Sequence, residues 1–445
     1  MESTPWARGR LQTHEFTSVR LALGMNVLVA SVDETMSQMY LCDEDMDDDD
    51  LDPPITMQSI MNIKCEFEGG ELTAPQAMAM MLDTHRSAMM VGKIILGGPK
   101  VTSVDDFHAG QWYELTKFER HHFTVMVQLH MKLPHQFRST VSRHWCSREI
   151  GIMIMILRWR GYDWKGIESI TNIRRNEASN LYHTAIDAYK ATDYVVLALN
   201  VDIMRVTPRI CEYQEACCAA GSTHPGMVCC ADGKPMPGCR PSHRAAKKRG
   251  YDYKDDIQRV FYNGHYAAHG LKMSHHIWAD GIVQVNVGSI SEADQKLMDR
   301  TSLDSVLRYI GENRIACGAI APTCYTDPAY TATDQIHRKH KGAITAEEKE
   351  DNCNMIRPRS AAEDTFKDFV NLFPYFDDRK KHMILTNGRA TYADEIIVAT
   401  VFYNLHTCFY SNQGAGLYYC APPSALEYMQ NCNMEPCGIP DIAIR

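Results

Sequence analysis

The sequence has no long hydrophobic run and no regular cysteine framework. The nearest approach to such a run, Ile150 to Leu157, is too short to span a bilayer and is followed by Arg158 and Arg160. The segment MESTPWARGR at the start lacks the apolar core of a secretory signal, so we expect the sixteen cysteines to be free thiols in a reducing compartment. These absences favour a soluble protein without a membrane partner.

Basic residues are missing from one long stretch of the chain. No Lys or Arg occurs between Arg20 and Lys64, where ten acidic residues lie between Asp33 and Asp52. The net charge is −9, so the rest of the chain carries about +1. An acidic run of this kind is usually solvated and disordered. The alternative is an acidic segment that competes with DNA for the protein's own basic surface.

The length of 445 residues and the 45% content of hydrophobic residues predict two to four folded domains. Residues 1–115 are a poorly defined region that includes the acidic run. Residues 116–192 show amphipathic periodicity and predict a helical domain. Its last three helices have helix-turn-helix spacing, and the final one would present Arg174, Arg175 and Asn176 to DNA. A plain helical bundle explains the same spacing equally well.

Residues 193–415 read as an α/β domain, and residues 416–445 as a C-terminal tail. Strands are predicted at Tyr194–Leu199, Val228–Ala231, His269–Trp278, Gly281–Val287 and Ile315–Tyr325, with helices at Asp294–Ile310 and Ser360–Leu372. The strands come first in this domain, and further strands then alternate with helices. This order predicts a mixed sheet flanked by helices.

Four acidic residues of this domain lie at predicted strand or helix positions. Asp232 follows the apolar run VCCA, Asp294 follows the strand that ends in GSI, Asp327 follows TCYT, and Glu363 lies within a helix. Carboxylates fixed at the edge of a sheet are suited to hold Mg²⁺ or Mn²⁺, which prefer oxygen ligands. A pair of such ions can stabilise both oxygens of a phosphodiester exchange. Each acid taken alone is more often a helix cap or a solvated turn residue.

The motifs around these acids resemble the PIF/Harbinger-type DDE superfamily endonucleases. The densest match is QRVFYNGHYAAHGLK, from Gln258 to Lys272, and it continues through WADGIVQVNVGSI. ADGKPMPGCRP matches the family's first acidic motif, TDPAY its second and RSAAEDTFKDF its third. VFYNLHTCFYSNQ and APPSALEYM resemble its closing segments. The similarity covers roughly residues 120–430.

The resemblance implies a ribonuclease H-like catalytic core preceded by an all-helical, helix-turn-helix-like domain. It identifies Asp232, Asp327 and Glu363 as the catalytic triad that holds divalent metal, Mg²⁺ or Mn²⁺, because the second acid of such a core ends the fourth strand. Asp294 becomes an additional metal or substrate contact. His265, Lys272, Arg359 and Lys367 are auxiliary candidates within the matched motifs. The implied activity is DNA cleavage at transposon ends and joining of the 3′-OH to target DNA.

Several residues depart from the family's pattern. Lys234 stands where Thr is usual, Ala293 where His is usual, Tyr266 to Ala268 where basic residues are usual, and Asp364 where an aromatic is usual. Lys234 could pair with Asp232 and weaken its affinity for metal. These departures favour an alternative, a domesticated DNA-binding or adaptor protein with weakened or no catalysis.

Basic and sulfur-containing residues gather just before and after Asp232. The run RPSHRAAKKRG, with Arg240, Lys247, Lys248 and Arg249, suits phosphate contacts or a nuclear-import signal, and equally a plain solvated loop. Six cysteines between Cys211 and Cys239 lack paired C-x-x-C spacing, so buried free thiols are favoured over a zinc-stabilised module.

The expected location is the nucleus, and the expected partner is DNA, at transposon terminal repeats and at a target site. The resemblance leaves open whether a separate Myb-like protein is needed and whether the chain forms a homo-oligomer.

Overall fold

The fold is described from a computed structural model that covers residues 107, 109–140, 145–241, 258–301, 303–314, 320–343, 345–377, 382–384 and 391–430. The acidic run of residues 33–52 and the basic residues Lys247, Lys248 and Arg249 lie outside these ranges. The backbone contacts divide the chain into two units, residues 1–101 with 164–178, and residues 102–163 with 179–445. Within the first unit the described elements are α7 (Trp164–Thr171) and the first turn of α8 (Arg175–Lys190).

The N-terminal part of the second unit is mostly helical. It contains α4 (Ala109–Thr116), α5 (Arg120–Leu129), the hairpin of β1 (Gln136–Arg138) with β2 (Trp145–Ser147), and α6 (Arg148–Trp159). Ser147 caps α6 by accepting a hydrogen bond from the Ile150 amide, as an N-cap serine should. Nearly all of α6 is buried, which explains its uninterrupted apolar sequence.

A short helical stretch follows α8 where the sequence predicted a strand. Residues Tyr194–Leu199 form the end of η2 (Asp193–Val195) and α9 (Val196–Leu199), so the strand prediction was wrong. The Thr192 hydroxyl accepts from the Tyr194 amide and starts the helical turn. Short apolar runs do not distinguish a buried strand from a buried helix. The chain continues through α10 (Ile203–Val206), η3 (Thr207–Arg209) and α11 (Ile210–Ala219).

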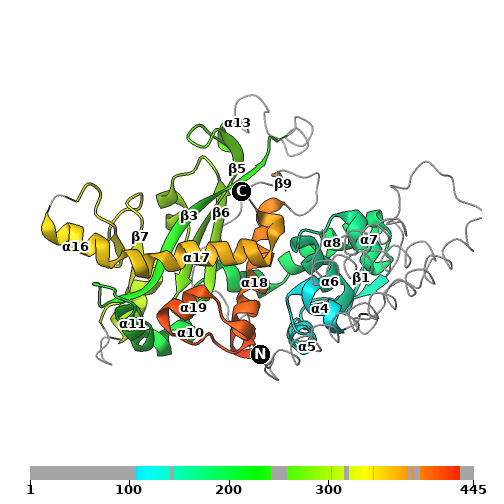
Figure 1. The fold of residues 1–445 in the computed structure, drawn as a ribbon, viewed down its shortest axis with the longest axis horizontal. Helices are drawn as coiled ribbons and strands as arrows, with labels where there is room; N and C mark the ends of the chain where they lie inside the picture. The colour runs from blue at the N-terminus through cyan, green and yellow to red at the C-terminus, as the bar shows by residue number, and fades with distance from the viewer. Residues whose placement is uncertain are drawn as a thin grey trace, which may run out of the picture. The chain divides into compact units, whose positions relative to one another are not determined.

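A mixed sheet forms the centre of the C-terminal part (Figure 1). Its main strands are β3 (Met227–Cys239), β5 (Ala268–Trp278), β6 (Val283–Ser289), β7 (Thr323–Thr326) and β8 (Ile336–Arg338). Their order is β6-β5-β3-β7-β8, in which β6, β5 and β3 are antiparallel neighbours and β3, β7 and β8 are parallel neighbours. The short strands β4 (Tyr262–Asn263) and β9 (His382–Met383) pair with β5 and β3.

The turn between β5 and β6 depends on an Asp-Gly pair. Gly281 has a positive φ of 80°, a conformation that residues with a Cβ adopt rarely. Asp280 accepts a hydrogen bond from the Ile282 amide and is completely buried. The sequence predicted this strand pair, and the structure confirms it.

Helices flank the sheet, so the prediction of an α/β domain with a mixed sheet between helices is confirmed. α17 (Ile356–Leu372) packs on β3 and β5 and α18 (Tyr392–Tyr410) packs on β6 (Figure 1). α14 (Asp294–Asp299) packs on β5 and β6. The Asn404 side chain of α18 bonds to both the amide and the carbonyl of Val283. The remaining elements are α13 (Gln258–Val260), α15 (Leu303–Arg314), α16 (Ala346–Asn354), η6 (Pro374–Phe376), α19 (Gln413–Tyr418) and α20 (Ala425–Gln430).

Among the described helices, none combines the length and the hydrophobicity that crossing a bilayer requires.

Candidate functional site

Asp232 and Asp327 lie side by side on neighbouring parallel strands. In the register of β3 with β7, Ala231 is opposite Thr326, and each aspartate is the next residue along its chain. Asp327 directly follows β7, as predicted. The sequence suggested that Asp232 follows the end of a strand. This prediction was wrong, because β3 continues past Asp232 to Cys239, paired with β5. It lies instead where the pairing of β3 with β7 stops.

Burial and the second aspartate both act on the protonation of Asp232. Desolvation raises the pKa of Asp232 above its usual range, and the negative charge of Asp327 raises it further. His275, the partner of Asp232 on β5, the Gly233 amide and Arg359 act in the opposite direction. A raised pKa means that the ionised form is disfavoured, so a bound cation would relieve an existing electrostatic cost.

Glu363 lies on α17 and is linked to Asp327 by Arg359, which pairs with both carboxylates. The two terminal nitrogens of Arg359 lie 3.3 Å from Asp327 Oδ1 and 2.7 Å from Glu363 Oε1. Arg359 and Glu363 are four residues apart and therefore share a face of the helix. The structure thus places Asp232 beside Asp327, and Arg359 joins Asp327 to Glu363.

Contacts along β3 and β5 fix the position of α17. Residues alternate along a strand, so Cys230, Asp232 and Lys234 point to one face of the sheet. Cys230 Sγ lies 3.4 Å from the Pro358 carbonyl, and the Lys234 ammonium lies 4.1 Å from the centre of the Phe366 ring. Lys234 therefore contacts an aromatic ring of α17, where the sequence had suggested a pairing with Asp232.

His275 adds a buried contact between β5 and α17. Its Nε2 is 2.8 Å from the Ala362 carbonyl, and the residue is almost completely buried. Burial lowers the pKa of His275, and a neutral ring whose Nε2 donates to that carbonyl fits this environment. Because Ala362 directly precedes Glu363, this contact fixes the helix next to the third acid. The sequence showed a histidine near the second strand but not this role.

Asp294 lies on the other face of the sheet. A Cβ on Gly233 would come within 2.3 Å of Asp294 Oδ1, and Gly233 points opposite to Asp232 because the two are consecutive in β3. The Lys272 ammonium lies 3.3 Å from Asp294 Oδ1 and donates to the Glu292 carbonyl. The two residues form a partly buried ion pair on the opposite face of the sheet from Asp232.

The other predicted residues are spread over the described surface. His265 lies in the turn between β4 and β5, and Ala268, where β5 begins, is about 23 Å along the strand from His275. Lys367 pairs with Asp364 on the exposed side of α17. Arg174, Arg175 and Asn176 are exposed at the start of α8, and Arg240 is exposed just after β3. His265 thus lies away from the acids, whereas Lys367 is one helical turn after Glu363 on α17. Arg174, Arg175, Asn176 and Arg240 are open to solvent.

The three carboxylates fit a divalent cation by the chemistry of their donors. They are oxygen ligands, two of them lie on adjacent strands, and a cationic group already lies between two of the three. In the described ranges, no three His, Cys, Asp or Glu side chains form a ready-made group for a metal ion. Every described cysteine is a free thiol, as the sequence predicted.

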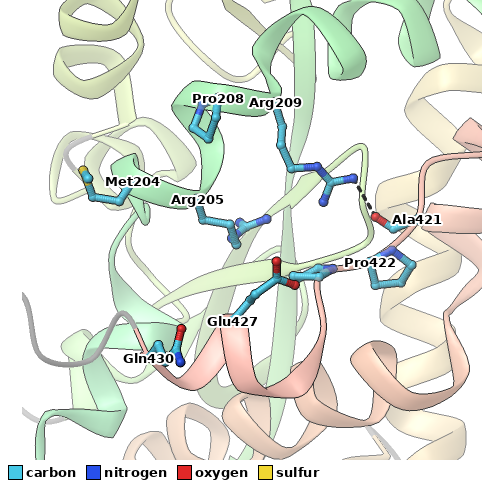
Figure 2. A pocket seen from close by; sticks show the side chains of 9 residues that line it. Met204, Arg205, Pro208, Arg209, Ala421, Pro422, Glu427 and Gln430 are labelled. Carbon is cyan, nitrogen blue, oxygen red and sulfur yellow. Dashed lines mark hydrogen bonds between the residues drawn. The ribbon is translucent and has the colours of Figure 1, made fainter.

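A separate hollow of about 390 Å³ lies at the start of α11 (Figure 2). Its wall includes Arg205, Arg209 and the loop from Ala421 to Pro423, and Arg209 donates to the Ala421 carbonyl. Behind it, Asp280 accepts hydrogen bonds from Arg205, Arg209 and Tyr213. Ala421 to Pro423 and Asp280 lie in segments that resemble the family, but the sequence had assigned none of these residues to a site.

No model of a known protein family matches the chain, and neither a curated protein nor a solved structure matches it.

Proposed function

We propose that the chain is a metal-dependent endonuclease and DNA strand-transferase of the PIF/Harbinger type. The observation that carries the proposal is the position of Asp232 beside Asp327, with Arg359 joining Asp327 to Glu363, since the three acids come from separate motifs. The metal that they would hold is Mg²⁺ or Mn²⁺, which supplies charge stabilisation to a phosphodiester during its exchange.

The sheet order supports a ribonuclease H-like core. Three antiparallel strands, β6, β5 and β3, are continued by the parallel strands β7 and β8. Among the main strands β7 is the fourth along the chain, and Asp327 follows it directly. That is the position which the second acid of the triad takes in such a core.

Each residue of the site has a separate role in this proposal. Asp232 and Asp327 would hold metal where the pairing of β3 with β7 stops, and Glu363 would complete the site from α17. His275 fixes the helix beside Glu363 through the Ala362 carbonyl. Arg174, Arg175 and Asn176 at the exposed start of α8 would contact DNA in a helix-turn-helix-like domain, and a Myb-like protein would be its partner in the nucleus. Asp294 belongs to a supporting ion pair with Lys272.

The second candidate function is a DNA-binding adaptor without catalysis. Ala293, which stands where the family usually has His, favours this function. Arg359 also favours it, because its single positive charge pairs with two of the three acids. The departure at Lys234 carries less weight, because the ammonium lies against the Phe366 ring.

Nicking of supercoiled plasmid DNA by the purified full chain distinguishes the two functions. We expect nicked product with Mg²⁺ or Mn²⁺ and none with excess EDTA, because the chemistry requires bound metal. Retardation of the same DNA in a gel, with no nicking in either metal, would favour the adaptor.

A further inference from the structure

Arg359 occupies the position between two acids that the proposed function assigns to a cation. Its guanidinium nitrogens approach Asp327 Oδ1 at 3.3 Å and Glu363 Oε1 at 2.7 Å, one from the sheet and one from the helix. One cationic side chain therefore contacts two of the three acids.

A guanidinium and a divalent cation compete for the same oxygen atoms. A guanidinium donates hydrogen bonds to the lone pairs of a carboxylate, and a metal ion coordinates through those lone pairs. Two cationic groups within a few ångströms also repel each other. A cation that bridges Asp327 and Glu363 must therefore release Arg359 from at least one of them.

The ion pairs of Arg359 with Asp327 and Glu363 are exposed enough to solvent for Arg359 to be released from them. The side chains of Asp327 and Glu363 are 42% and 45% exposed, and that of Arg359 is 21% exposed. Ion pairs that contact water to this degree are weak. The pair of Arg205 with Asp280 in the same domain is different, since both side chains are almost completely buried. Of these two ion pairs, water and ions can therefore reach only the one that Arg359 forms.

We propose that Arg359 is a displaceable internal cation, which holds Asp327 and Glu363 together until a divalent metal ion enters and releases it. This inference rests on the proposed function, because it needs metal at the triad. It gives Arg359 a positioning role in the metal-free protein. It also makes metal loading a competition, so the affinity for metal is lower than the three acids alone would give.

Titration of Mn²⁺ into the full chain by isothermal calorimetry tests the competition. Arg359→Gln should bind Mn²⁺ roughly tenfold more tightly than the wild type, because the competing charge is gone. Arg359→Lys should lie between the two, since an ammonium keeps the charge but lacks the planar fork that bridges two carboxylates. The matched control is Arg357→Gln, which removes an exposed arginine from the same helix and should leave the affinity unchanged.

Thermal unfolding supplies a second measurement and shows that each variant is folded. Saturating Mn²⁺ should raise the melting temperature of Arg359→Gln more than that of the wild type, because tighter binding stabilises the folded state further. One outcome separates the two proposals: the wild type binds Mn²⁺, Asp327→Ala does not, and Arg359→Gln binds no more tightly than the wild type. In that case the proposal that Arg359 is displaced by metal is wrong, and the proposed function stands. If the wild type and Arg359→Gln both fail to bind Mn²⁺, both ideas are wrong.

Discussion

Replacing Asp232 with asparagine should reduce metal-dependent DNA nicking by at least about 10³-fold. Asparagine keeps the size of the side chain but loses the charge that holds the metal ion. Charge stabilisation by a metal is worth several kcal/mol, and about 1.4 kcal/mol corresponds to a factor of ten in rate. The measurement is the initial rate of nicking of supercoiled plasmid at saturating Mn²⁺.

The control for this substitution is Asp299→Asn, which makes the same chemical change at an exposed position at the end of α14. It should nick DNA at the rate of the wild type. Nicking by Asp232→Asn within about threefold of the wild-type rate would remove Asp232 from the site. The folded state of both variants is checked by their unfolding midpoints, which should not differ greatly since the removed charge of Asp232 is electrostatically costly.

Replacing Asp280 with asparagine should destabilise the domain by about 3–5 kcal/mol. Asp280 is completely buried and accepts hydrogen bonds from Arg205, Arg209 and Tyr213. Without its charge, the guanidinium of Arg205, whose side chain is 4% exposed, stays buried and keeps only the more distant carboxylate of Asp202, 3.9 Å from its Nε. The loss of one partner of a buried pair is far more costly than the pair's net contribution to stability.

The measurement for Asp280→Asn is the free energy of unfolding from a urea titration. Asp304→Asn is the matched control, because Asp304 pairs with Arg308 on the exposed surface of α15. That surface pair should contribute less than about 1 kcal/mol. An equal, small effect of both substitutions would show that the network beneath the hollow of Figure 2 does not stabilise the fold.

The pattern of the sequence was sufficient to predict β3, which carries Asp232, and β5 beside it, but the strand predicted at Ile315–Tyr325 begins only at Thr323 within the described residues. Val228–Ala231 and His269–Trp278 are apolar and bounded by turn residues, and both are strands in the structure. The same reasoning failed at Tyr194–Leu199, where the run is short and the preceding Thr192 caps a helical turn. In this chain, an apolar run therefore predicted a strand correctly where a neighbouring strand was also predicted to pair with it.

The proximity of Asp232 and Asp327 was predictable, but the electrostatic environment of the acids was not. Asp232 and Asp327 follow apolar segments, and their proximity follows once these two segments pair in parallel. The position of Asp294 depends on which face of β3 Gly233 presents, and a shift of one residue in register would reverse it. The bridge from Arg359 to Asp327 joins residues of different elements, which no local spacing specifies.

The central claim is that Asp232, Asp327 and Glu363 together hold a divalent metal ion. The most direct test is isothermal titration of Mn²⁺ into the wild type and into Asp327→Ala. Asp327 is half-exposed, so its truncation should leave the fold intact. The account predicts Mn²⁺ binding by the wild type and its loss in Asp327→Ala. Equal binding by both proteins, or no binding by the wild type, would contradict it.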